Sequence, residues 1–173
     1  TTNGVTVAPG SWAQVYPVPP TATSTALVSS KSPSVTGEEV TYTATVSPTP
    51  DAGAVSFSDG ATPIAGCGSA TLITGVATCT TSPTSTGGHT ITATYSGSSA
   101  FAGSTSPPLT QTVEAAATST SVTSSKNPSV AGESVTYTAA VAVTSPGGGT
   151  PTGTVAFKDG AATLAGCDSR PLS

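Results

Sequence analysis

The sequence predicts an all-β protein composed of two related β-sandwiches, the second of them truncated. Of its 173 residues, 35 are Thr and 26 are Ser, whereas 7% are charged and none is Met. β-branched residues lose rotamer freedom in helices and pack well on pleated sheets, so this composition favours strands. Two further observations support the prediction: the chain repeats itself after about 100 residues, and its apolar residues alternate with Thr.

An internal repeat gives the domain organisation. Residues 23–46 return as residues 118–141, at an offset of 95. Residues 53–67 return as residues 153–167, at an offset of 100. The five additional residues of the second copy fall within 143–152, a Gly- and Pro-rich stretch in which insertions have a small free-energy cost. This period suits sandwiches of roughly 100 residues better than the shorter units of a solenoid.

Three segments follow from the repeat. Residues 1–20 are expected to form an N-terminal extension or linker, residues 21–114 a complete domain, and residues 115–173 the N-terminal half of a second domain. Cys167 is the counterpart of Cys67, and its own partner would fall six residues beyond the end of the sequence. We expect the second copy to be completed by further sequence or by another chain, or to be disordered.

Strands of the complete copy are expected where apolar residues alternate with Thr. Residues 40–46 and 90–95 both show this pattern, which is the period of a half-buried strand. Val55 and Phe57 form a short strand that ends at a tight turn of Asp59 and Gly60. The remaining strands of about seven are expected around Leu72, Ile73 and Val76, and over residues 109–113.

The predicted core is short of large side chains, so a covalent tie would help to stabilise the domain. Its bulk is expected from Tyr42, Phe57, Tyr95 and Phe101. We interpret Cys67 and Cys79 as a disulfide, for which loop-closure entropy gives about 3 kcal/mol. Two buried thiols are the alternative, and a metal site is not expected because the chain has one His. A disulfide implies an oxidising location outside the cytoplasm.

Several motifs carry a resemblance to a known family. They are "NPSVAGESVTYTA" at 127–139, "GTVAFKDG" at 153–160, the paired cysteines, and the closing stretch at 87–113. These motifs are similar to those of the bacterial Ig-like domains often called Big_3, which occur in tandem on exported bacterial proteins. The resemblance implies immunoglobulin-like Greek-key sandwiches. It also implies a role as stalk, spacer or adhesive module. Ser98 stands where the family more often has an acidic residue, so no cation site is expected in that loop.

Composition excludes two classes of partner. Four cationic residues and a net charge of −4 make nucleic acid an unsuitable partner. No run of about 20 apolar residues could span a bilayer, and the N-terminus does not resemble a signal peptide. The disulfide and the family resemblance imply a secreted, cell-surface protein, whose signal peptide is expected to lie outside this chain.

No catalytic, cofactor-binding or metal-binding residue is predicted, and the protein is expected not to be an enzyme. His89 is interpreted as a solvated residue at the start of a strand, because the sequence places no acid to orient it. Glu38 and Glu39 are expected on a strand, with side chains on opposite faces. Asp59 and Asp159 are explained by their turns, and a calcium site would need more oxygen ligands.

Lys31 and Lys126 occupy matching positions in the two copies, as do Glu38 and Glu133. Some bacterial surface domains join a Lys to Asn or Asp covalently. However, Asn127 adjoins Lys126 and is replaced by Ser32 in the first copy, and neighbours in sequence cannot cross-link opposite strands. We interpret both lysines as solvated residues that precede a turn.

Trp12 and Tyr16 are candidate contact residues outside the repeat. Their rings could stack on a ligand, or residues 13–18 could dock as a strand on a neighbouring chain. A linker stiffened by Pro17, Pro19 and Pro20 is favoured over ligand binding.

Three functional hypotheses remain at this point. The first is a structural spacer of an exported bacterial surface protein, with neighbouring Ig-like modules as its partners. The second is a subunit of a self-assembling extracellular fibre or virion surface, in which identical subunits exchange strands. The third is a carbohydrate-binding or adhesive module that contacts a cell-surface glycan or protein through Trp12 and Tyr16.

Overall fold

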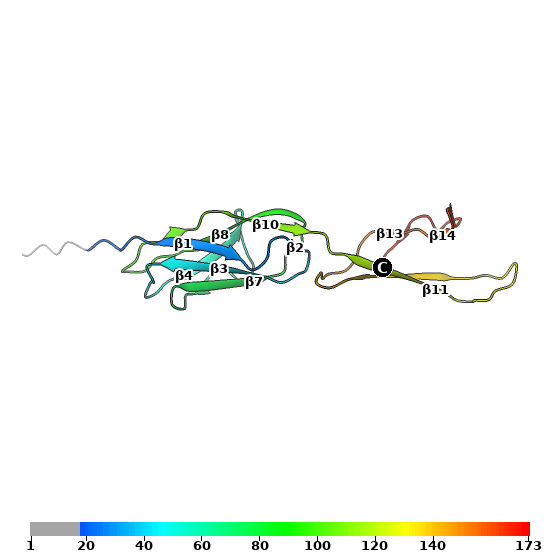
Figure 1. The fold of residues 1–173 in the computed structure, drawn as a ribbon, viewed down its shortest axis with the longest axis horizontal. Helices are drawn as coiled ribbons and strands as arrows, with labels where there is room; N and C mark the ends of the chain where they lie inside the picture. The colour runs from blue at the N-terminus through cyan, green and yellow to red at the C-terminus, as the bar shows by residue number, and fades with distance from the viewer. Residues whose placement is uncertain (1–17) are drawn as a thin grey trace, which may run out of the picture.

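The structure of the chain is a computed structural model that describes residues 18–173. Every regular element within these residues is a β-strand, so the predicted all-β class is confirmed. Figure 1 shows a closed sandwich formed by the first copy, followed lengthwise by an open pair of strands and loops formed by the second copy.

Two sheets make up the first copy. The smaller sheet has the order β1 (Ser24–Ser29), β3 (Val40–Ser47), β7 (Val76–Thr81). The larger has the order β2 (Ser34–Val35), β10 (Leu109–Glu114), β8 (Gly87–Tyr95), β4 (Ala54–Asp59), β5 (Thr62–Pro63), with β6 (Ala70–Thr71) beside β4 and β9 (Ser104–Thr105) beside β8. Neighbours are antiparallel except β2 and β10, which run parallel. The chain enters the sandwich at one end and leaves from the opposite end (Figure 1).

Alternation in the sequence places the core between the sheets. Strand β3 buries every second residue, beginning with Val40, and its intervening Thr side chains face outward. Strand β8 follows the same rule over its second half, from Ile91 to Tyr95. Fully burying one large apolar side chain contributes about 1.5–3 kcal/mol, and these two strands supply seven of the thirteen buried apolar residues. The buried apolar residues are Val40, Tyr42, Ala44, Val46, Val55, Phe57, Cys67, Ala77, Cys79, Ile91, Ala93, Tyr95 and Val113.

One expected strand residue lies elsewhere. Ile73 is 72% exposed, and it lies in the turn between β6 and β7 rather than in a buried strand. Thr74 there adopts a positive φ of 49°, followed by Gly75, so the chain reverses direction at this point. The residues around Leu72 and Ile73 therefore form a turn directly before β7, and not the strand that the sequence predicts.

Cys67 and Cys79 form a disulfide that joins the two sheets, with their Cα atoms 5.6 Å apart. Cys79 belongs to β7 of the smaller sheet, where it pairs with Tyr42. Cys67 is held to the larger sheet because the Phe57 N–H donates to its carbonyl oxygen at 3.0 Å. The bridge therefore ties the two layers of the sandwich together across the core.

The second copy reproduces the first pair of strands. Its β11 (Thr118–Ser124) pairs with β12 (Tyr137–Val143) in the register that β1 and β3 adopt. Two short pairs follow, β13 (Thr154–Val155) with β16 (Arg170–Pro171), and β14 (Lys158–Asp159) with β15 (Ala162–Thr163). Cys167 is not in a disulfide and is half-buried. Within residues 18–173, no strand pairs with the second edge of β12.

Candidate functional site

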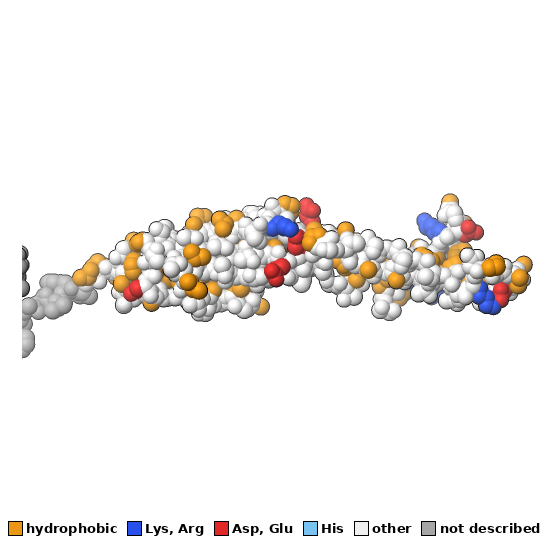
Figure 2. Space-filling model, turned by 60° about the horizontal axis from the view of Figure 1, so that its bottom comes forward, with side chains coloured by type: hydrophobic (Ala, Val, Ile, Leu, Met, Phe, Trp, Pro, Cys, Tyr) orange, Lys and Arg blue, Asp and Glu red, His pale blue; other side chains and the backbone are white. Residues whose placement is uncertain are grey.

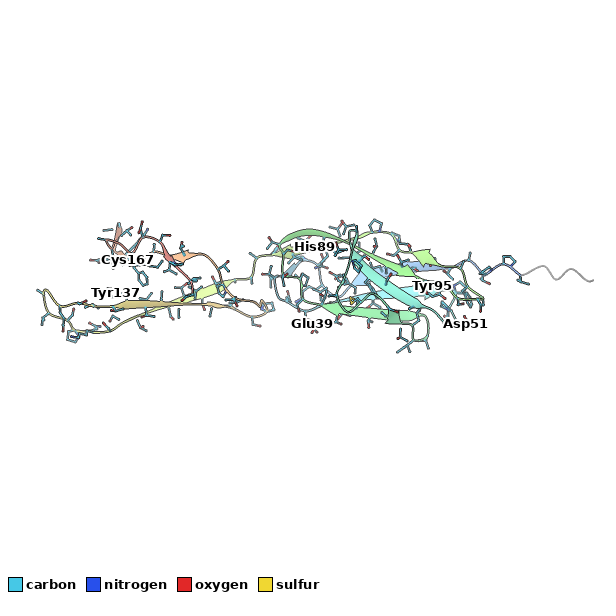
Figure 3. All side chains as sticks on the ribbon, turned by 180° about the vertical axis from the view of Figure 1, so that it is seen from behind. Glu39, Asp51, His89, Tyr95, Tyr137 and Cys167 are labelled. Carbon is cyan, nitrogen blue, oxygen red and sulfur yellow. A yellow bond between two sulfur atoms is a disulfide. The ribbon has the colours of Figure 1, made fainter. Side chains whose placement is uncertain are left out.

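Polar contacts gather at the end of the first sandwich that faces the second copy. We call this end the base, and define it as the turn at 34–38, the loop at 82–86, and residue Glu114. Figure 3 shows His89 near this end, whereas Asp51 and Tyr95 lie toward the opposite end. Several of the few ionisable side chains of the first copy therefore contact one another at or near the base.

His89 lies on β8 and is held from two sides. Its Nδ1–H donates to Asp59 Oδ2 at 2.5 Å, and its Nε2–H donates to the backbone oxygen of Ser85 at 3.0 Å. Asp59 also accepts a hydrogen bond from the Thr90 N–H at 3.1 Å, which fixes its carboxylate. The expectation of a solvated His with no orienting acid is wrong: the side chain is 18% exposed and Asp59 orients it.

The geometry favours a structural role for the His89 side chain over that of a catalytic base. Ser85, His89 and Asp59 have the residue types of a nucleophilic triad, yet His89 Nε2 lies 3.5 Å from the Ser85 hydroxyl and 3.0 Å from its carbonyl. A base needs a free lone pair on Nε2, whereas a carbonyl oxygen facing that atom demands a proton on it. The hydrogen bond to Asp59 and then that to the Ser85 carbonyl raise the pKa of His89, which favours the doubly protonated ring.

Tyr42 lies beside this cluster, in a shallow hollow that Asp59 and His89 also line. Burial, with a smaller contribution from the Asp59 charge, raises the pKa of the Tyr42 hydroxyl to about 12. The phenol therefore stays neutral at physiological pH and does not act there as a proton acceptor.

Glu38 forms the second tie of the base. Its carboxylate pairs with the Lys31 ammonium and accepts a hydrogen bond from the Val35 N–H at 3.0 Å. Lys31, and then the Val35 N–H, lower the pKa of Glu38. The expectation that Glu38 lies on a strand is wrong, because it precedes β3 and turns back across the turn at 34–38. Lys31 is 51% exposed but paired, so it is not simply a solvated lysine.

The second copy repeats this tie. Lys126 pairs with Glu133, whose carboxylate also accepts the Val130 N–H at 3.2 Å. The pKa of Glu133 is lowered in the same way, first by Lys126 and then by Val130. Since each lysine meets a carboxylate in the same turn, the recurrence of Lys31 and Lys126 is explained by a pair of ionic ties.

The second copy also presents an open apolar face. Tyr137 on β12 is 48% exposed, and it lines a hollow together with Phe157 and Cys167. Figure 3 shows the strand of Tyr137 on one side of this half and the segment of Cys167 on the other. In the first copy the counterpart Tyr42 is buried between the two sheets, so the same side chain lies in a core there and near solvent here.

Trp12 and Tyr16 lie outside the described residues, so their proposed contacts remain a prediction. Within residues 18–173, no group of three or more His, Cys, Asp and Glu side chains gathers as a metal site would require. Ser98 donates to Asp51 at 2.9 Å, which gives that loop an ordinary polar contact. The part of the chain that the structure describes has no helix of the length and apolarity that a membrane crossing needs.

A model of the bacterial Ig-like domain family, group 3, matches residues 27–114. This match spans the closed sandwich from β1 to β10 and covers half of the chain. The chain belongs to the bacterial Ig-like domain family. No curated protein and no solved structure matches it. Membership indicates a structural module of bacterial surface proteins from a family that is generally non-enzymatic. The disulfide fits an extracellular location.

Sequence reasoning missed the two ion-paired clusters of this Ig-like protein. Asp59 and His89 are 30 residues apart, and they meet only because β4 and β8 pair with Asp59 opposite Ile91. The register between β4 and β8 would have to be known in order to predict this contact. The repeat shows that Lys31 and Glu38 recur as Lys126 and Glu133, but this recurrence was not interpreted as an ion pair.

Proposed function

We propose that the chain is a non-enzymatic spacer of an exported bacterial surface protein, one that sets distance and direction between neighbouring parts. The observation that carries the proposal is the lengthwise arrangement of its two copies (Figure 1). The chain enters the first sandwich at one end, leaves at the other, and reaches β11 after three alanines, residues 115–117. A link this short restricts the angles that the two copies can adopt.

The surface supports the same proposal. Figure 2 shows a face covered mostly by uncharged side chains, with a few acidic and basic groups near the middle and the far end. The outward positions of β3 and β8 are Thr, whose hydroxyl groups keep a sheet face hydrated without charge. Such a face offers no strongly charged patch to attract a nucleic acid or an ionic ligand.

A display experiment tests the spacer proposal. The chain is placed between a membrane anchor and a fluorescent reporter on a bacterial surface, and energy transfer from the reporter to a dye in the membrane is measured. The control is a Gly/Ser linker with the same number of residues, which behaves as a random coil. We expect less energy transfer with the chain than with the control. Equal transfer in both would contradict the proposal.

A second candidate function is assembly between identical chains by strand exchange. The observation that favours it is the unpaired edge of β12, next to the exposed Tyr137 and the half-buried Cys167. An open apolar strand edge is a template for another strand. Size-exclusion chromatography over a range of protein concentrations separates the two functions. A spacer remains monomeric, whereas strand exchange gives polymers whose size increases with concentration.

A further inference from the structure

Glycine backbone of one copy lies against glycine backbone of the other where the two copies meet. Gly37, in the turn at 34–38, has a φ of +76°, and a Cβ built on it would lie 2.5 Å from the Gly148 Cα. The Gly148 N–H donates to the carbonyl oxygen of Thr36 at 3.0 Å. A side chain on Gly37 would therefore push the Gly148 segment away, and this contact requires glycine on the first copy.

The link between the copies is held from both sides. The Ala116 N–H donates to the Thr36 hydroxyl at 3.1 Å, which ties the link to the first copy. The Ala117 carbonyl accepts hydrogen bonds from the Thr144 N–H at 2.9 Å and from its hydroxyl at 3.1 Å, which ties it to the second. Each side of the joint thus bonds the backbone of the link.

The segment that makes the contact lies in the stretch where the second copy carries its additional residues. The five additional residues fall within 143–152, and that stretch includes Gly147, Gly148 and Gly149. The Gly147 N–H donates to the Thr144 carbonyl at 3.1 Å, so the chain turns back there toward the first copy. An extension in a loop is thermodynamically inexpensive, and here it reaches the neighbouring domain.

The turn at 34–38, which contacts this loop, is also held by hydrogen bonds to other parts of the first copy. The Thr36 N–H donates to the Glu114 carbonyl at 2.9 Å, and the Gly37 N–H donates to the Pro83 carbonyl at 2.7 Å. Glu38 adds its bond to Val35 and its pair with Lys31. The partners in these contacts lie on β10, in the loop at 82–86 and just after β1, so the turn is held from three sides.

We propose that the turn at 34–38 is a docking site for a glycine-rich loop of the following module, and that residues 147–149 are the loop that occupies it. When this loop is docked, the two copies on either side of the link at 115–117 keep a fixed direction relative to each other. This inference rests on the proposed spacer function and specifies how the spacer keeps its direction.

The second copy supplies a matched control for the first. Its turn at 129–133 has the same backbone: Gly132 has a φ of +83°, and the Glu133 N–H donates to Val130 as Glu38 does to Val35, both at 3.1 Å. However, a Cβ on Gly132 would meet no atom within 4 Å. Gly37→Ala and Gly132→Ala therefore introduce similar backbone strain, and only Gly37→Ala obstructs the joint.

Amide hydrogen exchange of the full chain measures the contact directly. In the unmodified chain we expect the Gly148 amide to be protected, and we expect Gly37→Ala to reduce that protection about tenfold through local opening. Gly132→Ala should leave Gly148 unchanged. Equal exchange at Gly148 in all three proteins would overturn the proposal.

Spin labels measure the direction of the joint. Cys167 carries one nitroxide and Thr45→Cys the other, and double electron–electron resonance gives the distribution of distances between the copies. We expect a narrow distribution that broadens when residues 147–149 are deleted. A second pair, Cys167 with Ser119→Cys, lies within the second copy and should not respond to the deletion. Equally broad distributions between the copies before and after the deletion would overturn the proposal.

The two measurements distinguish this inference from the proposed function. A flexible joint that still reduces energy transfer in the display experiment would leave the spacer function intact and remove the docking site. A fixed joint with energy transfer equal to that of the Gly/Ser control would leave the docking site intact and remove the spacer function.

Discussion

The two copies share most of their aligned residues, yet only the first has a closed core. Tyr42 is 1% exposed, whereas its counterpart Tyr137 is 48% exposed. Cys67 is in a disulfide, whereas Cys167 is not. What separates them is the rest of the sandwich: β3 pairs with β7 and faces the sheet that contains β4, β8 and β10, whereas within residues 18–173 β12 pairs with β11 alone.

Local structure, in contrast, is the same in both copies. The Phe57 N–H donates to Cys67 at 3.0 Å, and Phe157 donates to Cys167 at 2.9 Å. The Lys–Glu ties recur as well. The comparison teaches that residues close in sequence determine turns, whereas burial depends on strands from distant parts of the chain.

The largest expected effect comes from removing the tyrosine of β3. Tyr42→Ala leaves a cavity between the sheets and should lower the free energy of unfolding by about 3–5 kcal/mol. Tyr137→Ala removes a ring that is already near solvent, and the expected loss in the same transition is much smaller. Urea unfolding followed by circular dichroism measures both. Equal losses would show that the second copy has a closed core in solution.

Removing the disulfide should have the next largest effect. Replacing Cys67 and Cys79 together with Ala should lower the free energy of unfolding by about 3 kcal/mol, because the unfolded chain regains loop entropy. Cys167→Ala is the matched control and should not change this transition. If Cys167→Ala destabilises the chain as much as the double replacement, then Cys167 has a partner in solution.

His89, which has no counterpart in the second copy, should give the first copy a dependence on pH. Because its pKa is raised in the fold, its stabilisation is complete below the ordinary value of 6.5 and is lost as pH rises through the raised pKa. The contribution should be at most about 1 kcal/mol, as for a partly exposed ion pair. Urea midpoints measured from pH 5 to pH 9 should converge for the chain and His89→Gln at the alkaline end. A constant difference between them would exclude the ionic tie.

The smallest effect is expected from the carboxylates of the two turns. Glu38 and Glu133 have lowered pKa values, so each stabilises the fold above the ordinary value of 4.5 and loses this contribution as pH falls through the lowered pKa. Glu38→Gln should lower the thermal midpoint at pH 7 slightly, and Glu133→Gln should lower it less, because its side chain is 27% exposed rather than 8%. The difference between the variants should vanish at pH 2, and a difference that persists there would point to a cause other than charge.

The sequence predicted much of this fold because its signals are local. Alternation on β3 and β8, the turn at Asp59 and Gly60, and the placement of Cys67 with Cys79 can all be read from short segments. The pairing of Asp59 with His89 could not be read in this way, since it depends on the register between two strands. The contact of Gly37 with Gly148 was hidden for a similar reason, because it depends on how one domain meets the next.

The bridge between Cys67 and Cys79 has a consequence for a module pulled by its two ends. Force enters through β1 and leaves through β10, and the chain between the two cysteines cannot extend while the S–S bond holds. The bridge spans 12 residues in sequence, which would otherwise add roughly 40 Å of contour length at about 3.4 Å per residue. A stretched module therefore lengthens less under load when oxidised, and adding a reductant lets it extend further.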